Sequence, residues 1–285
     1  MPLPNTPADV ALVVQRALAE DIGSGDITAR LVPAGQRAEA RVISREAAVI
    51  CGRPWVDEVF VGIDAGIVVC WQVAEGDTVE PDQTLFTLTG PARGLLTGER
   101  TALNFLQTLS GTATAVRRYV EAVRGTSAAI VDTRKTLPGL RNAQKYAVVC
   151  GGGINHRIGL YDGILIKENH IAAAGGITAA IANARALNAG VPLMTEAENM
   201  GEAKAALAAD VDLLLVDDFA DADLREAVML TRAHRARGGK TLIEYSGGAT
   251  LDNVRTIAET GVDRISIGAI TKHLRAVDLS MRFTA

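Results

Sequence analysis

The sequence predicts an α/β protein in which a small N-terminal α/β sandwich domain precedes an incomplete, TIM-like α/β barrel. After about residue 125, strand-like apolar runs alternate six times with Ala-rich helical segments, a pattern typical of a parallel sheet covered by helices. Before it, short Val- and Ile-rich runs are broken by Gly, Asp and Pro. The 285 residues suffice for two moderate domains. We therefore divide the chain near residue 110, with the barrel over 111–270.

Composition excludes several classes of protein. The 48% share of hydrophobic residues is that of a globular protein. The net charge of −4 argues against a nucleic-acid coat, which needs a basic surplus. The N-terminus is too acidic for a signal peptide and no run reaches the ~20 apolar residues of a membrane span, so a soluble, cytoplasmic protein is expected. Cys51, Cys70 and Cys150 lack metal-binding spacing and are expected to be buried free thiols.

The first domain is expected to open with an amphipathic helix over 7–20, followed by the Gly-rich acidic turn EDIGSGDIT. Short strands should follow between about 38 and 88. The segment 98–124 has helical periodicity, and Gly111 within it either divides the helix or admits a close neighbour.

Six buried strands are expected in the barrel, at 128–132, 163–166, 191–196, 212–216, 241–245 and 264–268. No GxGxxG or P-loop pattern follows the first of them, which disfavours a doubly wound sheet. Polar or glycine residues follow each apolar run. Because the carboxyl ends of barrel strands face one mouth, and active sites lie there, these residues should converge on one cavity.

Charge is segregated among these strand-end residues. Six basic residues lie between Thr133 and Lys167, where Asp162 is the only acid, and arginine clusters bind carboxylates and phosphates. Glu196 and Asp217 form an opposite, anionic pole that suits Mg²⁺ bridged to a polyanionic substrate. The glycine-bearing ends SGG and IGA suit a phosphate. The ligands should therefore carry carboxylates, a phosphate and a metal-bound polyphosphate.

The long string DTRKTLPGLRNAQKYAVVCGGGINHRIGLYDGILIKENHI, together with GERTALNFLQTLSGTAT and GVDRISIGAITKH, resembles the quinolinate phosphoribosyltransferase family over nearly the whole chain. The resemblance implies transfer of phosphoribosyl from phosphoribosyl pyrophosphate to quinolinate with decarboxylation, in NAD biosynthesis. It also implies that residues 271–285 rejoin the first domain, 1–110, and that the protein is a homodimer or a hexamer of dimers.

The resemblance also assigns roles. Lys135, Glu196 and Asp217 would be catalytic, with Mg²⁺ at the two carboxylates directly or through the substrate. Substrate would be bound by two groups, one for the quinolinate carboxylates and one for the 5-phosphate. The substrate-binding residues are Arg100 (reaching the neighbouring subunit's site), Thr133, Arg134, His156, Arg157, Lys167, Ser246, Gly247, Gly248, Gly268 and Ala269.

Three positions depart from the family pattern: Met194 replaces the first Glu of Glu-x-Glu-x-Glu, Asp218 replaces Asn, and Tyr245 replaces a small residue. Three other functions fit the sequence less well. A barrel lyase would use Lys135 or Lys167 as a Schiff base, but the arginine surplus disfavours it. The segment AEGDTVEPDQTLFTLTG resembles biotinyl and lipoyl carrier domains but contains no lysine. A molybdenum-transport-linked paralogue shares the fold, and the TRK, NHR and IKENH motifs favour quinolinate over it.

Overall fold

The computed structural model describes residues 3–284, and their contacts divide them into two compact units. The first contains the residues up to 117, 135–152 and those from 269 on, and the second contains 118–134 and 153–268. Contact density alone does not define an independently folding domain, so the predicted division at residue 110 stays a prediction.

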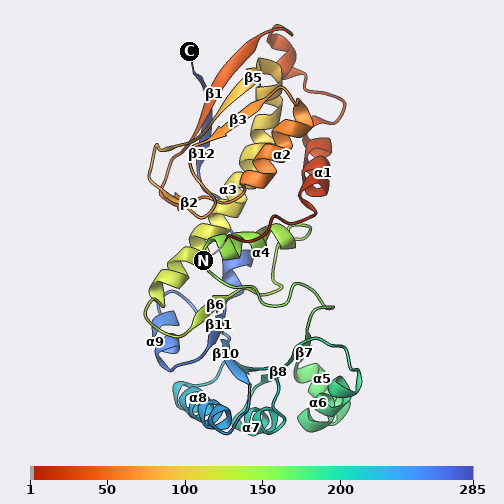
Figure 1. The fold of residues 1–285 in the computed structure, drawn as a ribbon, viewed down its shortest axis with the longest axis vertical. Helices are drawn as coiled ribbons and strands as arrows, with labels where there is room; N and C mark the ends of the chain where they lie inside the picture. The colour runs from red at the N-terminus through yellow and green to blue at the C-terminus, as the bar shows by residue number, and fades with distance from the viewer. Residues whose placement is uncertain (1–2, 285) are drawn as a thin grey trace. The chain divides into compact units, whose positions relative to one another are not determined.

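An antiparallel sheet organises the first unit, with strand order β12-β1-β5-β3 (Figure 1). Its strands are β1 (Arg37–Ser44), β3 (Val68–Trp71), β5 (Thr84–Pro91) and β12 (Leu279–Thr284). The end of the chain enters this sheet as an edge strand, because β12 pairs with β1 from Ser44↔Leu279 to Glu39↔Thr284. A separate two-stranded ladder joins β2 (Ala48–Val49) and β4 (Thr78–Val79).

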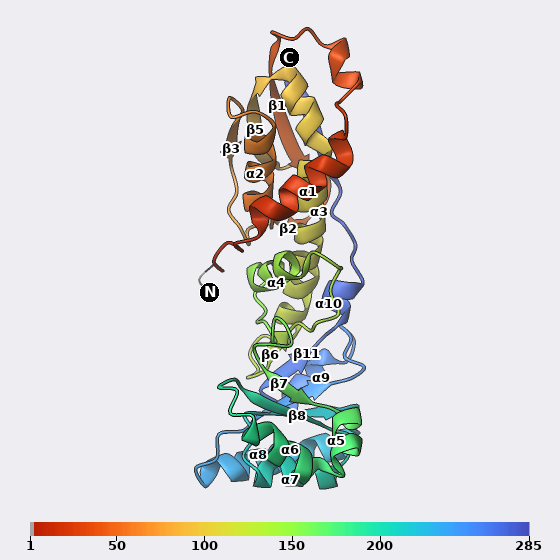
Figure 2. The ribbon, with the colours of Figure 1, turned by 90° about the vertical axis from the view of Figure 1, so that its right-hand side faces the viewer.

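Helices supply the rest of this unit's core, and Figure 2 shows α1, α2 and α3 beside the sheet. They are α1 (Val10–Ile22), η1 (Thr28–Leu31), α2 (Arg53–Ile63), α3 (Ala92–Ala122), α4 (Arg141–Cys150) and α10 (Ala269–Lys272). Helix α2 buries Trp55, Val56, Val59 and Phe60, the i, i+4 spacing of one helical face. Fully burying each such side chain contributes ~1.5–3 kcal/mol.

Helix α3 is longer than predicted and runs unbroken through Gly111. A Cβ built on Gly111 would lie 2.3 Å from the backbone oxygen of Arg275. The glycine therefore admits a close neighbour and does not divide the helix. Of the three cysteines, which are all free thiols, Cys51 and Cys150 are buried as predicted. The prediction was wrong for Cys70, which is exposed on β3.

Six parallel strands form the sheet of the second unit, in the order β6-β11-β10-β9-β8-β7. They are β6 (Ala129–Val131), β7 (Ile164–Ile166), β8 (Leu193–Ala197), β9 (Leu213–Asp217), β10 (Leu242–Ser246) and β11 (Arg264–Ser266). Each of these strands overlaps a strand expected from the sequence. The predicted α/β fold class is confirmed. Residue Ile154 adds one parallel bridge to Val131, at the outer edge of β6.

The two faces of this sheet carry different side chains. Met194, Leu213 and Leu215 pack together on the inner face, and the strand register carries every second residue to the same face. The outer face is covered by helices (Figure 1). These are α5 (Glu168–Ala174), α6 (Ile177–Ala186), α7 (Met200–Ala208), α8 (Asp221–Ala236) and α9 (Val254–Glu259). Polar residues at the carboxyl ends of the strands are thereby presented on the inner face.

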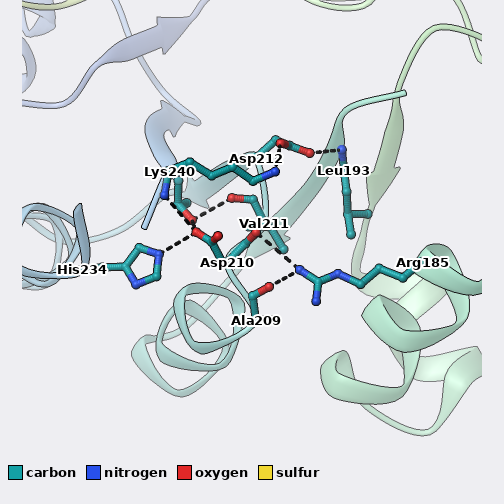
Figure 3. Close-up of polar contacts among 9 residues, drawn as sticks. Arg185, Leu193, Ala209, Asp210, Val211, Asp212, His234 and Lys240 are labelled. Carbon is teal, nitrogen blue, oxygen red and sulfur yellow. Dashed lines mark hydrogen bonds and ion pairs between the residues drawn. The ribbon is translucent and has the colours of Figure 1, made fainter. Parts of the chain in front are cut away.

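A polar cluster around Asp210 and Asp212 ties together the amino-terminal ends of β8, β9 and β10 (Figure 3). One carboxylate oxygen of Asp210 accepts from His234 Nε2 at 2.8 Å and from the Lys240 backbone N–H at 2.9 Å. Asp212 accepts the backbone N–H of Leu193 at 2.7 Å and pairs with Lys240 Nζ at 2.8 Å. These contacts join the amino-terminal ends of three strands. They therefore have a structural role at the end of the sheet opposite the predicted site.

No helix within residues 3–284 is both long and apolar enough to cross a membrane.

Candidate active site

Three predicted site residues lie on neighbouring strands of the inner face. Lys167 follows β7, Glu196 lies in β8 and Asp217 ends β9. The β8–β9 register pairs Glu196 with Leu215, so Asp217 lies on the same face two residues further along. The Lys167 ammonium forms an ion pair with the Glu196 carboxylate, whose side chain is only 10% exposed. The carboxyl ends of these strands therefore present both signs of charge.

Arg134 and Arg157 form a second part of the site, where two positive charges lie near the single carboxylate of Asp162. Burial, followed by the like charge of Arg134, lowers the pKa of Arg157, which places the two guanidinium groups close enough to repel. Arg157 Nη1 donates to the backbone oxygen of Gly163 at 2.9 Å. The buried Nε of Arg134 has no hydrogen-bond partner among residues 3–284. Two adjacent cations with an unsatisfied donor are the arrangement that binds a carboxylate or phosphate.

His156 is buried beside this pair and is held by two hydrogen bonds from the backbone. Its backbone N–H donates to Asp132 Oδ1 at 2.7 Å, and its ring nitrogen Nδ1 accepts the backbone N–H of Arg157 at 2.8 Å. Because Nδ1 is an acceptor, the neutral ring carries its proton on Nε2. That atom lies 3.8 Å from Glu244 Oε1. The imidazole is therefore fixed in orientation and in tautomer.

Glu244 is a site residue that the sequence reasoning missed. It lies in the middle of β10 with 0% exposure. Burial raises its pKa to about 7, the Ser266 hydroxyl and the charge of Arg264 oppose this rise, and Asp132 adds to it. An acid within the otherwise apolar run TLIEY was the signal that could have identified it. A carboxyl group that titrates near neutrality therefore lies inside the barrel next to His156.

The glycines after β10 permit a close approach of backbone to backbone. Gly247 and Gly248 have φ angles of +96° and +57°, which favour glycine. A Cβ on Gly247 would lie 2.9 Å from the Asp218 nitrogen and 3.1 Å from Asp217 Oδ1. The Asp218 N–H donates to the oxygen of Ser246 at 2.9 Å. The strand ends of β9 and β10 are thus joined, and Asp217 lies directly against the glycine turn.

Two residues that depart from the family pattern, Met194 and Tyr245, lie on opposite faces of the sheet. Met194 lies on the inner face against Leu213 and Leu215, so the lost carboxylate is replaced by apolar packing below Glu196. Tyr245 alternates with the inward Glu244 and is 7% exposed, so it faces the covering helices. Of these two departures, Met194 alters the interior of the barrel and Tyr245 does not.

The predicted residues divide between the two compact units. The barrel unit holds Thr133, Arg134, His156, Arg157, Lys167, Glu196, Asp217, Ser246, Gly247, Gly248 and Gly268. The other three, Arg100, Lys135 and Ala269, belong to the first unit. Arg100 lies exposed on α3. Lys135 is also exposed, and its backbone oxygen accepts the Thr271 hydroxyl at 2.8 Å.

A cavity of about 590 Å³ enters the barrel unit from the amino-terminal ends of its strands. Met194, Leu213, Leu242 and Arg264 line it from the sheet, and His156 and Arg157 line it from the loop before β7. His156 and Arg157 therefore line a cavity together with residues from the amino-terminal halves of the strands.

Comparison with known proteins identifies the family. The family model for the N-terminal domain of quinolinate phosphoribosyl transferase matches residues 26–110, and that for its C-terminal domain matches 112–282. The chain is 43% identical over 274 residues to the nicotinate-nucleotide pyrophosphorylase [carboxylating] of Mycobacterium leprae, covering 94% of this chain and 95% of the relative. A probable enzyme of the same name in Bacillus subtilis is 40% identical over 266 residues, covering 93% and 90%.

Solved structures agree with the sequence matches. The nicotinate-nucleotide pyrophosphorylase of Francisella tularensis superposes with a TM-score of 0.93 at 43% identity, covering 98% of each chain. The fold and the charged strand ends define an enzyme of the barrel class of phosphoribosyltransferases. The chain belongs to the quinolinate phosphoribosyltransferase family.

Proposed function

We propose that this protein transfers the phosphoribosyl group of phosphoribosyl pyrophosphate to quinolinate, giving nicotinate mononucleotide, carbon dioxide and pyrophosphate in the de novo synthesis of NAD. Family membership supports the reaction. The observation that carries it is the Arg134–Arg157 pair, in which a buried guanidinium N–H of Arg134 lacks an acceptor within the described chain. A pyridine dicarboxylate supplies the acceptors.

In this proposal Arg134, His156, Arg157 and Lys167 bind the two quinolinate carboxylates. The guanidinium groups make bidentate contacts, and the fixed tautomer of His156 directs an N–H into the barrel. The Lys167 ammonium lies at the Glu196 carboxylate, so it brings the bound diacid next to the residue that faces the ribose. Thr133, which is half-buried directly before Arg134, completes this part of the site.

The 5-phosphate of the second substrate would lie at the glycine turns. Ser246, Gly247 and Gly248 offer backbone N–H groups where a side chain would otherwise intervene, and Gly268 and Ala269 offer a second turn at the start of α10. Lys135, which is exposed, would meet the diphosphate. Positioning two multiply charged substrates in one pocket contributes up to ~7–11 kcal/mol to catalysis.

Mg²⁺ fits the residues present. Asp217 is a hard oxygen ligand beside the glycine turn, whereas Glu196 is already paired with Lys167. The ion would be bound largely by the substrate's own oxygens together with Asp217. Glu196 would act from outside this set of ligands. When bound, Mg²⁺ neutralises the diphosphate and favours its departure.

The chain's own carboxylates act on the ribose. As the bond from C1 to the diphosphate breaks, positive charge develops on the sugar, and Glu196 and Asp217 stabilise it electrostatically. The pyridine nitrogen then bonds to C1. The resulting pyridinium accepts the electron pair left when the adjacent carboxylate departs as carbon dioxide, so no covalent nucleophile is needed.

We include in this proposal a homodimer, or a hexamer of dimers, in which Arg100 reaches the neighbouring site, and a cytoplasmic location. The exposure of Arg100 on α3 supports its contact with a neighbouring subunit. The three free cysteines support a reducing compartment such as the cytoplasm. A barrel lyase is the weaker alternative, because Lys167 faces a carboxylate rather than the apolar surroundings that activate a Schiff-base lysine.

The test is a spectrophotometric assay of quinolinate consumption. We expect consumption only with both phosphoribosyl pyrophosphate and Mg²⁺, and with equal release of carbon dioxide. Consumption that is independent of phosphoribosyl pyrophosphate, or none at all in a folded preparation, contradicts the proposal. Borohydride trapping with carbonyl substrates tests the lyase reading in the same preparation.

A further inference from the structure

Three side chains that can bind metal meet inside the first compact unit. Cys51 lies just before α2, Glu75 lies between β3 and β4, and Cys150 is the last residue of α4. Their ligand atoms all lie within 4.8 Å of one another, and all three residues are buried. Nothing in the phosphoribosyl transfer described above uses them.

The carboxylate of this cluster is held in one orientation by the backbone. Glu75 Oε1 accepts the N–H groups of Gly52 at 2.9 Å and Arg53 at 2.5 Å. Its other oxygen, Oε2, accepts the Gly52 N–H at 3.2 Å and the Cys150 thiol at 3.6 Å. The start of α2 therefore holds both carboxylate oxygens, and Oε2 also faces the Cys150 sulfur. This is the outer-shell support that orients a metal-binding carboxylate.

The two cysteines are equally well fixed. The Cys51 N–H donates to Ser110 Oγ at 3.0 Å, and that hydroxyl donates to the Cys51 oxygen at 3.2 Å. The Cys150 oxygen accepts Arg117 Nη2 at 3.3 Å. Because these backbone positions are held, little conformational freedom is lost when the side chains take up a ligand.

The chemistry of the cluster selects a soft divalent cation. Two thiol groups and one carboxyl group, all buried with their ligand atoms within 4.8 Å of one another, can be anionic together only with a cation between them. Two thiolates and one carboxylate suit Zn²⁺ and its analogues Co²⁺ and Cd²⁺, and not Mg²⁺. Tetrahedral ligation at ~2.3 Å separates ligand atoms by ~3.8 Å, which fits within the observed 4.8 Å limit.

We propose that Cys51, Glu75 and Cys150 form a structural binding site for one zinc-class divalent cation, separate from the Mg²⁺ of the proposed reaction. On binding, each Sγ–H bond breaks, the two protons pass to the buffer, and two sulfur–metal bonds form. The ion links the start of α2 to the end of α4, two segments about 100 residues apart in the chain. Its stabilising effect grows with the free ion concentration.

The test uses full-length protein stripped with a chelator under reducing conditions and then titrated with Co²⁺. We expect one Co²⁺ per chain, with the sulfur-to-cobalt charge-transfer band and the visible bands of tetrahedral cobalt. The double variant C51S/C150S should lose both signals. C70A, which removes the exposed cysteine on β3, is the matched control and should keep them.

A featureless or octahedral cobalt spectrum in the wild-type protein overturns the proposal, because it shows that the thiols are not ligands. Equal cobalt binding by C51S/C150S overturns it as well. Should the double variant fail to fold, zinc release from the reconstituted wild-type protein by a thiol-specific mercurial decides the matter. One equivalent released supports the site, and none released refutes it.

Discussion

Replacing Glu244 with glutamine should remove a pH-dependent destabilisation of the barrel. The carboxyl has 0% exposure, and its pKa rises from 4.5 to about 7 in the folded protein. Glutamine keeps the shape and loses the ability to ionise. His156 Nε2, which lies 3.8 Å from the carboxyl, can still approach a neutral oxygen.

The sign follows from linkage. A carboxyl with a raised folded-state pKa binds its proton more tightly when folded, so its contribution is fully present below pH 4.5. That contribution is lost as the pH rises through about 7. At ~1.36 kcal/mol for each pH unit between the two values, the wild-type protein loses on the order of 3 kcal/mol. The Glu244→Gln variant should gain that amount relative to wild type between pH 5 and pH 8.

Urea unfolding followed by far-ultraviolet circular dichroism at pH 5, 6.5 and 8 measures the effect. Fluorescence is unsuitable because both tryptophans, Trp55 and Trp71, lie in the other compact unit. Glu198→Gln, at an exposed position just after β8, is the matched control and should follow the wild-type pH profile. Parallel stability profiles for wild type and Glu244→Gln would refute the reasoning.

Four further substitutions test the proposed reaction. Lys135→Ala and Asp217→Ala should each lower turnover ~100-fold or more through loss of transition-state electrostatics, and steady-state kinetics near wild type would remove either residue from the site. Arg134→Ala should chiefly weaken quinolinate binding in calorimetry, so an unchanged Kd would contradict its role. Gly247→Ala should weaken phosphoribosyl pyrophosphate binding, because its Cβ would lie 2.9 Å from the Asp218 nitrogen and its φ is +96°. Gly238→Ala is the control for backbone strain alone, because Gly238 also has a positive φ but has open space around its Cβ.

The barrel strands could be located from the sequence because a strand buried on both faces leaves a local signature. Runs such as LLLV (213–216) are continuously apolar and end where polar residues begin. That contrast needs no knowledge of neighbouring strands. Helix α3 was predicted from a different local signature, its helical periodicity. Its start at residue 92, six residues before the predicted start, was missed.

The strand-end position of Lys167, Glu196 and Asp217 followed from a topological rule, since parallel strands present their carboxyl ends on one side. The same rule could not place Glu244, which lies mid-strand, nor predict that Lys167 and Glu196 pair with each other. Pairing depends on the order of strands in the sheet, and that order, β8 beside β7, is a tertiary property.

By itself the sequence determined the fold class, the six strands, the family and the identity of the charged strand-end residues, because periodicity and motif spacing are properties of contiguous chain. Only the tertiary structure decided which groups lose water and which distant groups meet. Burial set the ionisation of Glu244, and packing brought Cys51, Glu75 and Cys150 together although their spacing in the chain resembles no metal motif. Desolvation and proximity depend on the whole surroundings of an atom, and those are assembled from segments far apart in the sequence.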